Sequence, residues 1–567
     1  MQILLLAGAF NSLTQRVFAE LGDHGHHVAV QLALGDASLR AAVQRYRPDL
    51  IIAPMLKSPV PYDIWSTHTC LIVHPGPAGD RGPSSLDWAI HEGASRWGVT
   101  VLQAEAEMDA GPVWASVPCD VPPVGKSDLY RNEIADAALE AVLIAVERFA
   151  SGTFVPRRQT DPALRGAVRT RPPMTQATRR IDWERDPTAT VLRKLRAADS
   201  RPGVRDELLG STWFLCGGHA ESRLSGRPGR LLATRAGAVC RATVDGAVWI
   251  PQLRPCRVPG GPAPFGLPAT LALGDRLPRL PEVPAPVHQD GERPAWSDIR
   301  YHEVGPAGFL SFSFPGGAMD TGQCRRLLAA YRVACTRPTS VLVLGGERDF
   351  FSNGIQLNVI EAAADPAAES WANIGAMDDL VEAVLTTTDR LVVAALGGNA
   401  AAGGAMLALA ADEVWCRRGA VLNPHYRLMG LYGSEYWTYT LPRRVGEDTA
   451  RRLTEQALPL SARAAAGLGL VDRLLECRPG EFPAEVAHLA ARTAEGPDVQ
   501  RRIAGKKAAL ERQNALRPLA AHRAAELARM RRTFFDPAAP YHALRGAFVH
   551  KEPPRATPMH LRSDRGR

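Results

Sequence analysis

A histidine and an aspartate in the first part of the chain lie at positions that suit proton transfer. In LIVHPGPAGDRGPSSLDWAI (71–90), His74 directly follows an apolar strand and precedes a Gly/Pro loop. In GVTVLQAEAEMDAGPVW (98–114), a second strand runs into a loop that carries Asp109. A carboxylate beside an imidazole orients the ring and stabilises its charged form. We expect the two strand ends to present both side chains to one cleft, although packing and turn formation are the simpler roles for either residue alone.

Two glycine-rich loops later in the chain could hold a developing negative charge. VLVLGGERDFFSNGIQL (341–357) predicts a strand and a tight turn, and LGGNAAAGGAMLALA (396–410) predicts a strand end, a Gly/Ala loop and the start of an apolar helix. Free N–H groups at a helix N-terminus stabilise an oxyanion, and the helix dipole adds to the effect. Glycine-rich turns alone more often serve close packing, so further motifs must support this interpretation.

Alternating strands and helices position the first pair of residues. Strands are predicted at Gln2–Leu6, Val28–Leu32, Leu50–Ala53, Cys70–His74 and Val99–Gln103, and helices at 13–22, 38–46 and 129–149. This alternation predicts an α/β fold with a doubly wound, mainly parallel sheet, whose ligand binds beyond the carboxyl ends of the strands. We assign this pattern to a first domain, residues 1–165.

Four further segments follow the first domain. Residues 166–280 have short strands with Gly/Pro turns and predict a small β-barrel-like domain. Residues 281–296 are rich in proline and charge, which predicts a linker. Strands and helices then alternate again in a second α/β domain, residues 297–480, and residues 481–567 predict an Arg/Ala-rich helical region.

The histidine and aspartate motifs resemble those of formyltransferases that use formyl-tetrahydrofolate, such as methionyl-tRNA formyltransferase. VHPGPAGDRGPSSLDWAI and GVTVLQAEAEMDAG match the two elements, and RRIDW (179–183) resembles the opening of that family's C-terminal barrel. The resemblance implies catalytic roles for His74 and Asp109. It also implies folate contacts from Met55, Leu56, Lys57 and Ser58.

One position departs from the formyltransferase pattern. The asparagine that the family has two residues before its histidine is Ile72 here. Loss of such an oxyanion donor typically costs ~3 kcal/mol. The departure favours another donor or another acceptor, and a thiol would fit because a thiolate is a strong nucleophile once an imidazole has taken its proton.

The two glycine-rich loops resemble the oxyanion loops of enoyl-CoA hydratases, the crotonase family, and LPRRVG (441–446) follows them in the family's order. The resemblance implies a crotonase-like domain with oxyanion-hole amides at Ile355 and Gly403. It also implies CoA contacts from Ser352, Gly354 and Gly404.

The acid/base residues of the hydratases are absent. The two catalytic glutamates correspond to Met406 and His425, which makes hydration an unlikely activity. Where hydratases have a small Gly-rich turn, this chain has Ser434, Glu435, Tyr436 and Trp437. Core packing is an alternative role for the two aromatic residues, whereas an unpaired buried carboxylate is costly, which favours a functional role for Glu435.

Both halves, together with DPAAPYHALRGAFVHKEPP near the C-terminus, resemble the HoxX family of nickel–iron hydrogenase maturation factors. The resemblance implies formyl transfer from formyl-tetrahydrofolate to coenzyme A, followed by cleavage of formyl-CoA into CoA and carbon monoxide, a ligand of the hydrogenase iron. Decarbonylation needs the thioester oxygen held but no water added, so the loops stay useful without the glutamates. We expect Glu435, with Tyr426 or Tyr439, to handle the formyl proton or position the formyl group.

Composition narrows the choice of partners. The formal charge of +8 and pI near 9.1 favour an acidic ligand, and the absence of zinc-finger or RNA-binding motifs favours a phosphate-rich small molecule over nucleic acid. Nine widely spaced cysteines without a CxxC pair predict no disulfide framework or metal site. The start MQILLLAGAF has no basic region, so we expect a cytoplasmic protein without a signal peptide or membrane segment.

Two other functions stay open. A formyltransferase with another acceptor, such as a sugar nucleotide or protein amine, fused to a degenerate crotonase domain would not consume CoA. A non-catalytic scaffold would bind CoA or folate together with the hydrogenase large-subunit precursor or iron-ligand maturation proteins, and it would tolerate His74→Ala. The sequence does not give the oligomeric state or the route of carbon monoxide delivery.

Overall fold

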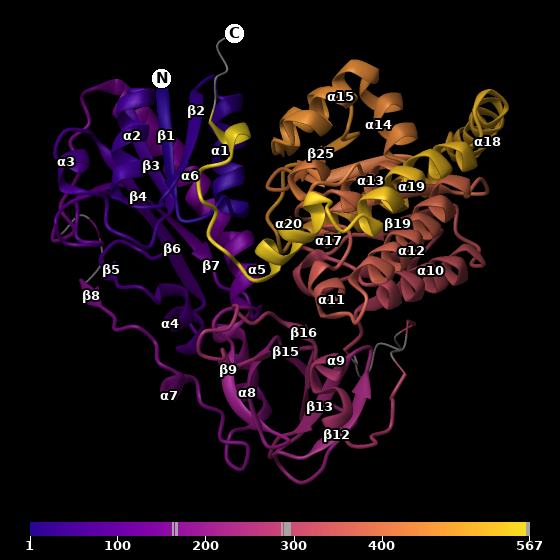
Figure 1. Cartoon of the computed structure of the whole chain (residues 1–567), viewed down its shortest axis with the longest axis horizontal. Coiled ribbons are helices and arrows are strands. Elements are labelled where there is room, and N and C mark those ends of the chain that lie inside the picture. The colour runs from indigo at the N-terminus through magenta and orange to yellow at the C-terminus, as the bar shows by residue number, and fades with distance from the viewer. Residues whose placement is uncertain (162–163, 165–167, 285–286, 289–295, 563–567) are drawn as a thin grey trace. The chain divides into compact units, whose positions relative to one another are not determined.

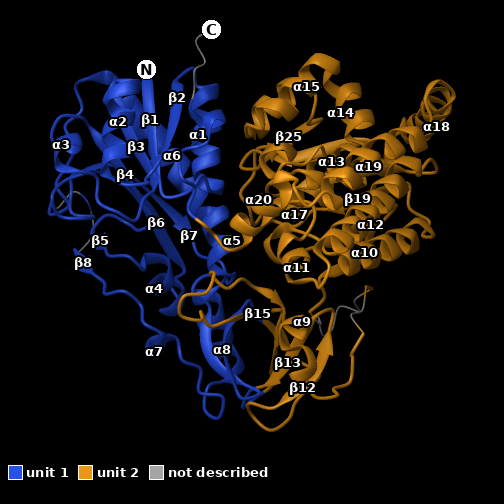
Figure 2. Ribbon diagram, viewed as in Figure 1, with its two compact units in different colours: residues 1–218, 243–245, 553–567 blue, residues 219–242, 246–552 orange. Residues whose placement is uncertain are grey.

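The structure is a computed structural model that describes residues 1–161, 164, 168–284, 287–288 and 296–562 (Figure 1). It divides into two compact units (Figure 2): unit 1 contains residues 1–218, 243–245 and those from 553 onward, and unit 2 contains residues 219–242 and 246–552. The predicted barrel domain, 166–280, therefore has residues in both units. Residues 285–286 and 289–295 of the predicted linker lie outside the described residues.

Unit 1 is built on a six-stranded sheet with the order β2-β1-β3-β4-β6-β7. The strands are β1 (Gln2–Ala7), β2 (His27–Leu32), β3 (Leu50–Met55), β4 (Cys70–His74), β6 (Arg96–Gln103) and β7 (Val113–Asp120). The first four run parallel, with helices such as α1 (Ser12–Asp23) and α2 (Asp36–Tyr46) between them. The last five residues of β1 are all buried, as expected for a parallel strand covered on both faces.

The sheet is mainly parallel, as predicted, but the strand pairing becomes antiparallel after β4. β6 pairs antiparallel with β4, with His74 opposite Thr100, and β7 pairs antiparallel with β6. The carboxyl ends of β4 and β6 therefore point in opposite directions. The loop after β6 brings Asp109 back toward His74: Asp109 has a φ of 57°, and Gln159 Nε2 donates to the carbonyl oxygens of Asp109 (2.7 Å) and Gly111 (3.0 Å).

The predicted barrel segment consists of short antiparallel strands. In unit 1, β9 (Val204–Leu208) and β10 (Ser211–Cys216) form a hairpin that contacts α8 (Thr188–Ala198). In unit 2, a four-stranded sheet has the order β11-β14-β13-β12. Its strands are β11 (His219–Glu221), β12 (Leu231–Arg235), β13 (Ala238–Ala242) and β14 (Ala247–Ile250).

Unit 2 also contains a larger six-stranded sheet with the order β17-β18-β19-β20-β22-β25. Its strands are β17 (Ile299–Val304), β18 (Ala307–Phe312), β19 (Val341–Gly345), β20 (Leu391–Leu396), β22 (Glu413–Arg417) and β25 (Arg473–Leu475). Only the edge strand β17 runs antiparallel to its neighbour; the other pairs are parallel. The apolar runs predicted from the sequence therefore form the centre of this sheet.

Helices on this sheet position the candidate site of unit 2. α12 (Pro366–Thr386) packs against α10 (Thr321–Cys335), α13 (Gly403–Leu409) and α19 (Leu519–Phe535). α14 (Trp437–Val445) contacts both α13 and α19. Figure 1 shows the C-terminal α19, in yellow, running beside α12. Within the predicted C-terminal region, 481–567, α19 thus packs onto helices of unit 2, whereas the residues from 553 onward belong to unit 1.

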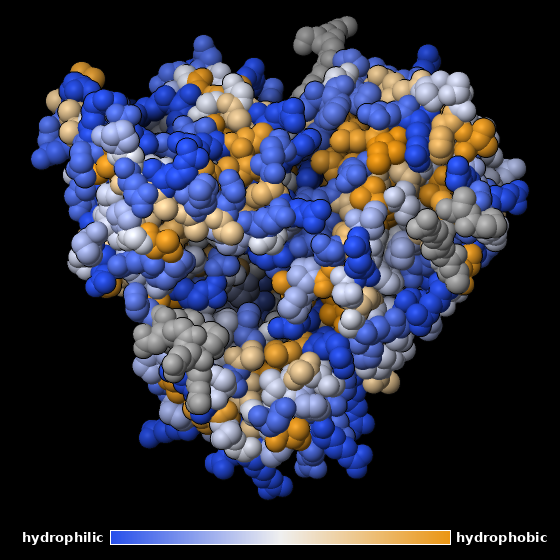
Figure 3. Space-filling model, turned by 180° about the vertical axis from the view of Figure 1, so that it is seen from behind, coloured by the Kyte–Doolittle hydropathy of each residue, from blue (hydrophilic) through white to orange (hydrophobic). Residues whose placement is uncertain are grey.

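No helix in the described ranges is both long and apolar enough to span a membrane. Figure 3 shows hydrophilic residues over most of the face it presents, with apolar residues gathered in separate patches. Among the described side chains, no group of three or more His, Cys, Asp or Glu is arranged to hold a metal ion. All nine cysteines are free thiols.

Candidate active sites

In unit 1, His74 lies between two carboxylates. Its Nε2 is 3.1 Å from Asp80 Oδ2, and its Nδ1 is 3.6 Å from Asp109 Oδ1. The His74 and Asp80 side chains are each only 4% exposed, whereas Asp109 is 17% exposed. The structure therefore brings together the predicted pair and adds Asp80. At 3.6 Å the Asp109 contact is an ion pair and not a hydrogen bond.

These carboxylates keep the imidazole charged. Burial lowers the pKa of His74, but Asp109 and Asp80 outweigh burial and raise this pKa to about 9. Burial raises the pKa values of Asp80 and Asp109, but His74, together with nearby donors and arginines, outweighs burial, so both pKa values lie below their usual range. At neutral pH the ring is an imidazolium, which can donate a proton and stabilise an oxyanion but cannot accept a proton.

The loop sequence after β4 is required for this geometry. A Cβ on Gly76 would lie 2.5 Å from both His74 Nε2 and Asp80 Oδ2, so only glycine leaves room for the pair. Arg171 Nε donates to Asp80 Oδ1 at 2.9 Å, which fixes the carboxylate from the other side. Sequence reasoning missed Asp80, although it lies within the quoted GDRG stretch directly before the Arg-Gly pair.

Asp109 also lines a pocket that contains several of the predicted folate residues. Leu56, Ser58 and Ile72 lie on its wall, so position 72, where formyltransferases have asparagine, faces this pocket. Lys57 is exposed, and the carbonyl of Met55 accepts a hydrogen bond from Gly8 N (2.8 Å) instead of lining the pocket. Of the four predicted folate residues, Leu56 and Ser58 therefore line the pocket, whereas Met55 and Lys57 do not.

In unit 2, the two glycine-rich loops lie against each other. Ala401 N donates to Ser352 O at 2.8 Å, and the same carbonyl would lie 2.0 Å from a Cβ on Gly404. A Cβ on Gly354, whose φ is 83°, would lie 3.2 Å from Gly403 N. The predicted CoA residues Ser352, Gly354 and Gly404 thus form the junction between the loops, where side chains would prevent the close approach.

This junction presents the two predicted oxyanion-hole amides. Gly403 is the first residue of α13, and Ile355 directly follows Gly354. Within the described part of the chain, neither backbone N–H donates to a protein acceptor. Backbone donors left free beside a helix N-terminus are suited to a carbonyl oxygen that gains negative charge.

The Glu435 carboxyl group lies against Gly403, which carries one of these amides. A Cβ on Gly403 would meet Glu435 Oε1 at 2.2 Å, while Glu435 Oε2 accepts hydrogen bonds from Tyr426 Oη (2.8 Å) and Ser434 N (3.0 Å). Glu435 is 1% exposed. Burial, followed by the charge of Asp378, raises the pKa of Glu435 to about 8. The geometry therefore places a carboxyl group with a raised pKa beside the predicted oxyanion-hole amide of Gly403.

Two further buried carboxylates, missed by sequence reasoning, surround Glu435. Asp378 on α12 and Glu526 on α19 are each fully buried, and burial is the main cause that raises their pKa values to about 6 and about 7. The sequence could have indicated both residues, because each is an acidic residue within the buried stripe of a helix. Asp378 lies beside Met377, and Glu526 lies between His522 and Met530. Such positions normally take apolar residues.

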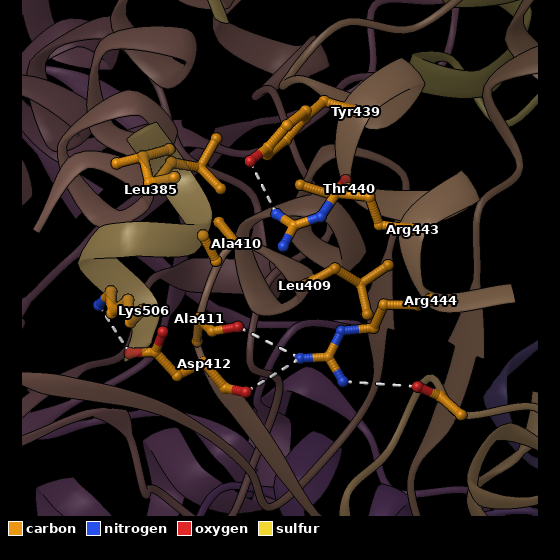
Figure 4. A pocket seen from close by; sticks show the side chains of 13 residues that line it. Leu385, Leu409, Ala410, Ala411, Asp412, Tyr439, Thr440, Arg443, Arg444 and Lys506 are labelled. Carbon is orange, nitrogen blue, oxygen red and sulfur yellow. Dashed lines mark hydrogen bonds and ion pairs between the residues drawn. The ribbon is translucent and has the colours of Figure 1, made fainter. Parts of the chain in front are cut away.

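The other predicted residues lie apart from Glu435. The Tyr439 hydroxyl donates to Gln513 Oε1, accepts from Arg443 Nη1 at 2.8 Å and lines a separate cavity of about 410 Å³ (Figure 4). Met406 is fully buried, and its sulfur accepts from Thr440. Tyr426, and not Tyr439, is therefore the tyrosine that contacts Glu435.

Comparisons with known proteins agree with this division. The family model described as "Formyl transferase" matches residues 14–146, "Formyl transferase, C-terminal domain" matches 173–258, and "Enoyl-CoA hydratase/isomerase" matches 318–554. The described fold and sites therefore define a formyltransferase module followed by an enoyl-CoA hydratase-like module.

Relatives with both modules give the family. The chain is 46% identical over 572 residues to "Hydrogenase maturation factor HoxX" of Bradyrhizobium diazoefficiens, covering 100% of this chain and 97% of that protein. The crystal structure of HypX from Aquifex aeolicus in complex with tetrahydrofolic acid is 42% identical, with a TM-score of 0.94 over 99% of this chain and 98% of the other. The chain belongs to this HoxX family of hydrogenase maturation factors, which confirms the predicted family and fold class.

Proposed function

We propose that this protein makes carbon monoxide in two steps. A formyl group passes from formyl-tetrahydrofolate to the sulfur of CoA, and the formyl-CoA is then split into CoA and carbon monoxide for the iron of a hydrogenase. The relative solved with tetrahydrofolic acid supports a folate cosubstrate, and the enoyl-CoA hydratase-like module supports CoA. The observation that carries the proposal is the Glu435 carboxylate lying over Gly403.

The first step uses the imidazolium of unit 1. The CoA thiolate attacks the formyl carbon, a C–S bond forms, and the bond from that carbon to the folate nitrogen breaks. The positive charge of His74 stabilises the oxyanion of the intermediate, and the departing nitrogen takes up one proton for the proton that the thiol loses. Asp80 and Asp109 keep the ring charged. His74 would thus supply the stabilisation that an amide at position 72 gives in formyltransferases.

The second step uses the carboxylate of unit 2. The amides of Ile355 and Gly403 bind the formyl oxygen, and Glu435 accepts the formyl hydrogen as a proton while the C–S bond breaks. The electron pair of that bond stays on sulfur, carbon monoxide leaves, and Glu435 returns the proton to the thiolate. The carbon keeps its oxidation state, so no oxidant or reductant is needed. The raised pKa of Glu435 makes its carboxylate a stronger base.

The test is incubation of the purified protein with formyl-tetrahydrofolate and CoA without oxygen, with carbon monoxide captured by reduced haemoglobin. We expect carbon monoxide only when both substrates are present. His74→Gln should abolish formyl-CoA formation but still split added formyl-CoA, whereas Glu435→Gln should form formyl-CoA and fail to release carbon monoxide. Each variant is the control for the other, because each removes one step.

Other outcomes would contradict the proposal in distinguishable ways. Formyl transfer to an amine without CoA consumption would assign the first module to a different acceptor. Binding of folate and CoA without turnover, together with an unchanged His74→Gln variant, would make the protein a scaffold.

A further inference from the structure

We propose that Asp378 and Glu526 are positioning residues that clamp the turn at Glu435 and Tyr436 and hold the Glu435 carboxylate over the oxyanion loop. The inference rests on the proposed splitting of formyl-CoA and assigns the groups that prepare its base. It derives from the backbone of the turn and from the hydrogen bonds that reach it from two distant helices.

The turn has a backbone conformation that needs external support. Glu435 and Tyr436 both have a φ of 58°, in the left-handed region that residues other than glycine rarely adopt. Two consecutive residues in this region persist only where the surrounding structure holds them. The conformation aims the Glu435 side chain back at Gly403, while α14 starts directly afterwards at Trp437.

Asp378 supports the first half of the turn from α12. Its Oδ1 accepts the backbone N–H of Glu435 at 2.8 Å, and both of its oxygens lie 2.8 Å from Ser434 Oγ. Arg523 on α19 lies 3.8 Å from the same carboxylate, so a cation balances part of its charge. Asp378 therefore holds the Ser434 side chain and the backbone N–H of Glu435.

Glu526 supports the second half from α19. Its carboxylate accepts the backbone N–H groups of Tyr436 and Thr438, each at 2.9 Å, and the Thr438 hydroxyl at 2.5 Å. Backbone N–H groups at the start of a helix have no partner within the helix, and the N-cap residue of α14 makes no side-chain cap. Glu526 thus caps α14 from another helix and holds the residue that follows Glu435.

The clamp also sets the charge environment of the base. The charged and titratable groups around Glu435 and Asp378 come from four elements. They are Cys324 on α10, Asp378 on α12, Arg523 (against Asp378) and Glu526 on α19, and Tyr426 before α14. After burial, the charge of Asp378 contributes most to the rise in the pKa of Glu435. Removing that charge should lower the pKa of Glu435.

The test compares Asp378→Asn with Asp379→Asn in the full-length protein. Asp379 is the next residue on α12, has a half-exposed side chain and pairs with the same Arg523, but makes no contact with the turn. The readouts are the rate of carbon monoxide release from formyl-CoA across pH and the ionisation of Glu435, followed by infrared spectroscopy of protein with isotope-labelled glutamate.

We expect Asp378→Asn to slow release at least ~10-fold and to move the midpoint of the pH profile down by roughly one unit, whereas Asp379→Asn changes neither. If Asp378→Asn does not fold, Ser434→Ala removes one donor to Asp378 and should give a smaller shift of the same sign. If the wild type is active and Asp378→Asn has the same midpoint of the pH profile, the proposed role of Asp378 and Glu526 is wrong. A wild type that releases no carbon monoxide would refute the proposed function, and the infrared midpoint would still decide the clamp.

Glu526→Gln gives an independent check on the second half of the clamp. The side-chain amide of Gln has one acceptor oxygen where Glu526 has two, so the turn should loosen. The charge of Asp378, which affects Glu435 more than that of Glu526, remains. We expect slower release with a smaller pH shift than in Asp378→Asn. A normal rate in this variant would remove Glu526 from the proposal.

Discussion

A single methyl group on Gly403 should displace the proposed base. Its Cβ would lie 2.2 Å from Glu435 Oε1 and 2.6 Å from Glu435 Cδ, so the carboxylate must retreat by about 1 Å to reach ordinary contact distance. Glu435 is held by Tyr426 and Ser434, and a hydrogen bond to a charged group contributes about 1.5–3 kcal/mol. A misplacement of ~1 Å costs ~100-fold in rate.

We therefore expect Gly403→Ala to slow carbon monoxide release from formyl-CoA by about 100-fold and to leave formyl transfer in unit 1 unchanged. Gly403 does not have a positive φ, so backbone strain should not add to the effect. The control is Gly375→Ala in α12, where a Cβ meets nothing within 4 Å and should add about 0.5–1 kcal/mol of stability. A folded Gly403→Ala enzyme with near-normal release would refute the placement of the base.

Three further outcomes follow from the two sites. Gly76→Ala should separate His74 from Asp80, because the Cβ would lie 2.5 Å from both partners, and lower formyl transfer at least ~10-fold while added formyl-CoA is still split; equal loss of both steps would contradict this. Asp80→Asn should lower the pKa of His74 from about 9, which proton NMR titration would detect, and an unchanged pKa would contradict the paired carboxylates. Glu435→Gln should melt at a higher temperature than the wild type at pH 9 but not at pH 4. A carboxyl pKa raised to about 8 makes the folded state lose stability as pH rises from the ordinary value of 4.5 through about 8; parallel melting curves at both pH values would contradict it.

The sequence predicts the residues that lie at the ends of regular elements. His74 ends an apolar strand and Gly403 begins an apolar helix, so local patterns locate both. Asp80 is harder to predict, because its contact with His74 depends on a loop whose path is set by Gly76 and Arg171. Even the His74 and Asp109 pair forms for a different reason than predicted, since β6 runs antiparallel to β4 and only the returning loop joins them.

The residues around Glu435 could not be derived from local patterns. Asp378 lies 57 residues before Glu435 in the sequence, and Glu526 lies 90 residues after Tyr436. No periodicity indicates which helices will pack around one turn, because that choice depends on the whole tertiary arrangement. What the sequence does show is a carboxylate inside an otherwise apolar helical stripe, a feature that calls for a partner wherever the helix packs.

The three buried carboxyl groups lower the stability of the folded state when they ionise, which supports the proposed role in the reaction. Asp378, Glu435 and Glu526 each have a pKa raised by burial, so their ionised forms oppose the folded state. Arg523 lies against Asp378, but Glu435 has only neutral donors on its oxygens. A leucine or methionine would fill the same space without this cost, as Met406 does on the neighbouring helix. The chain thus has a methionine where a hydratase places its glutamate and a carboxylate on the turn before α14, beside the same oxyanion loop. That change suits the proposed reaction, in which a proton moves from carbon to sulfur and no water is added.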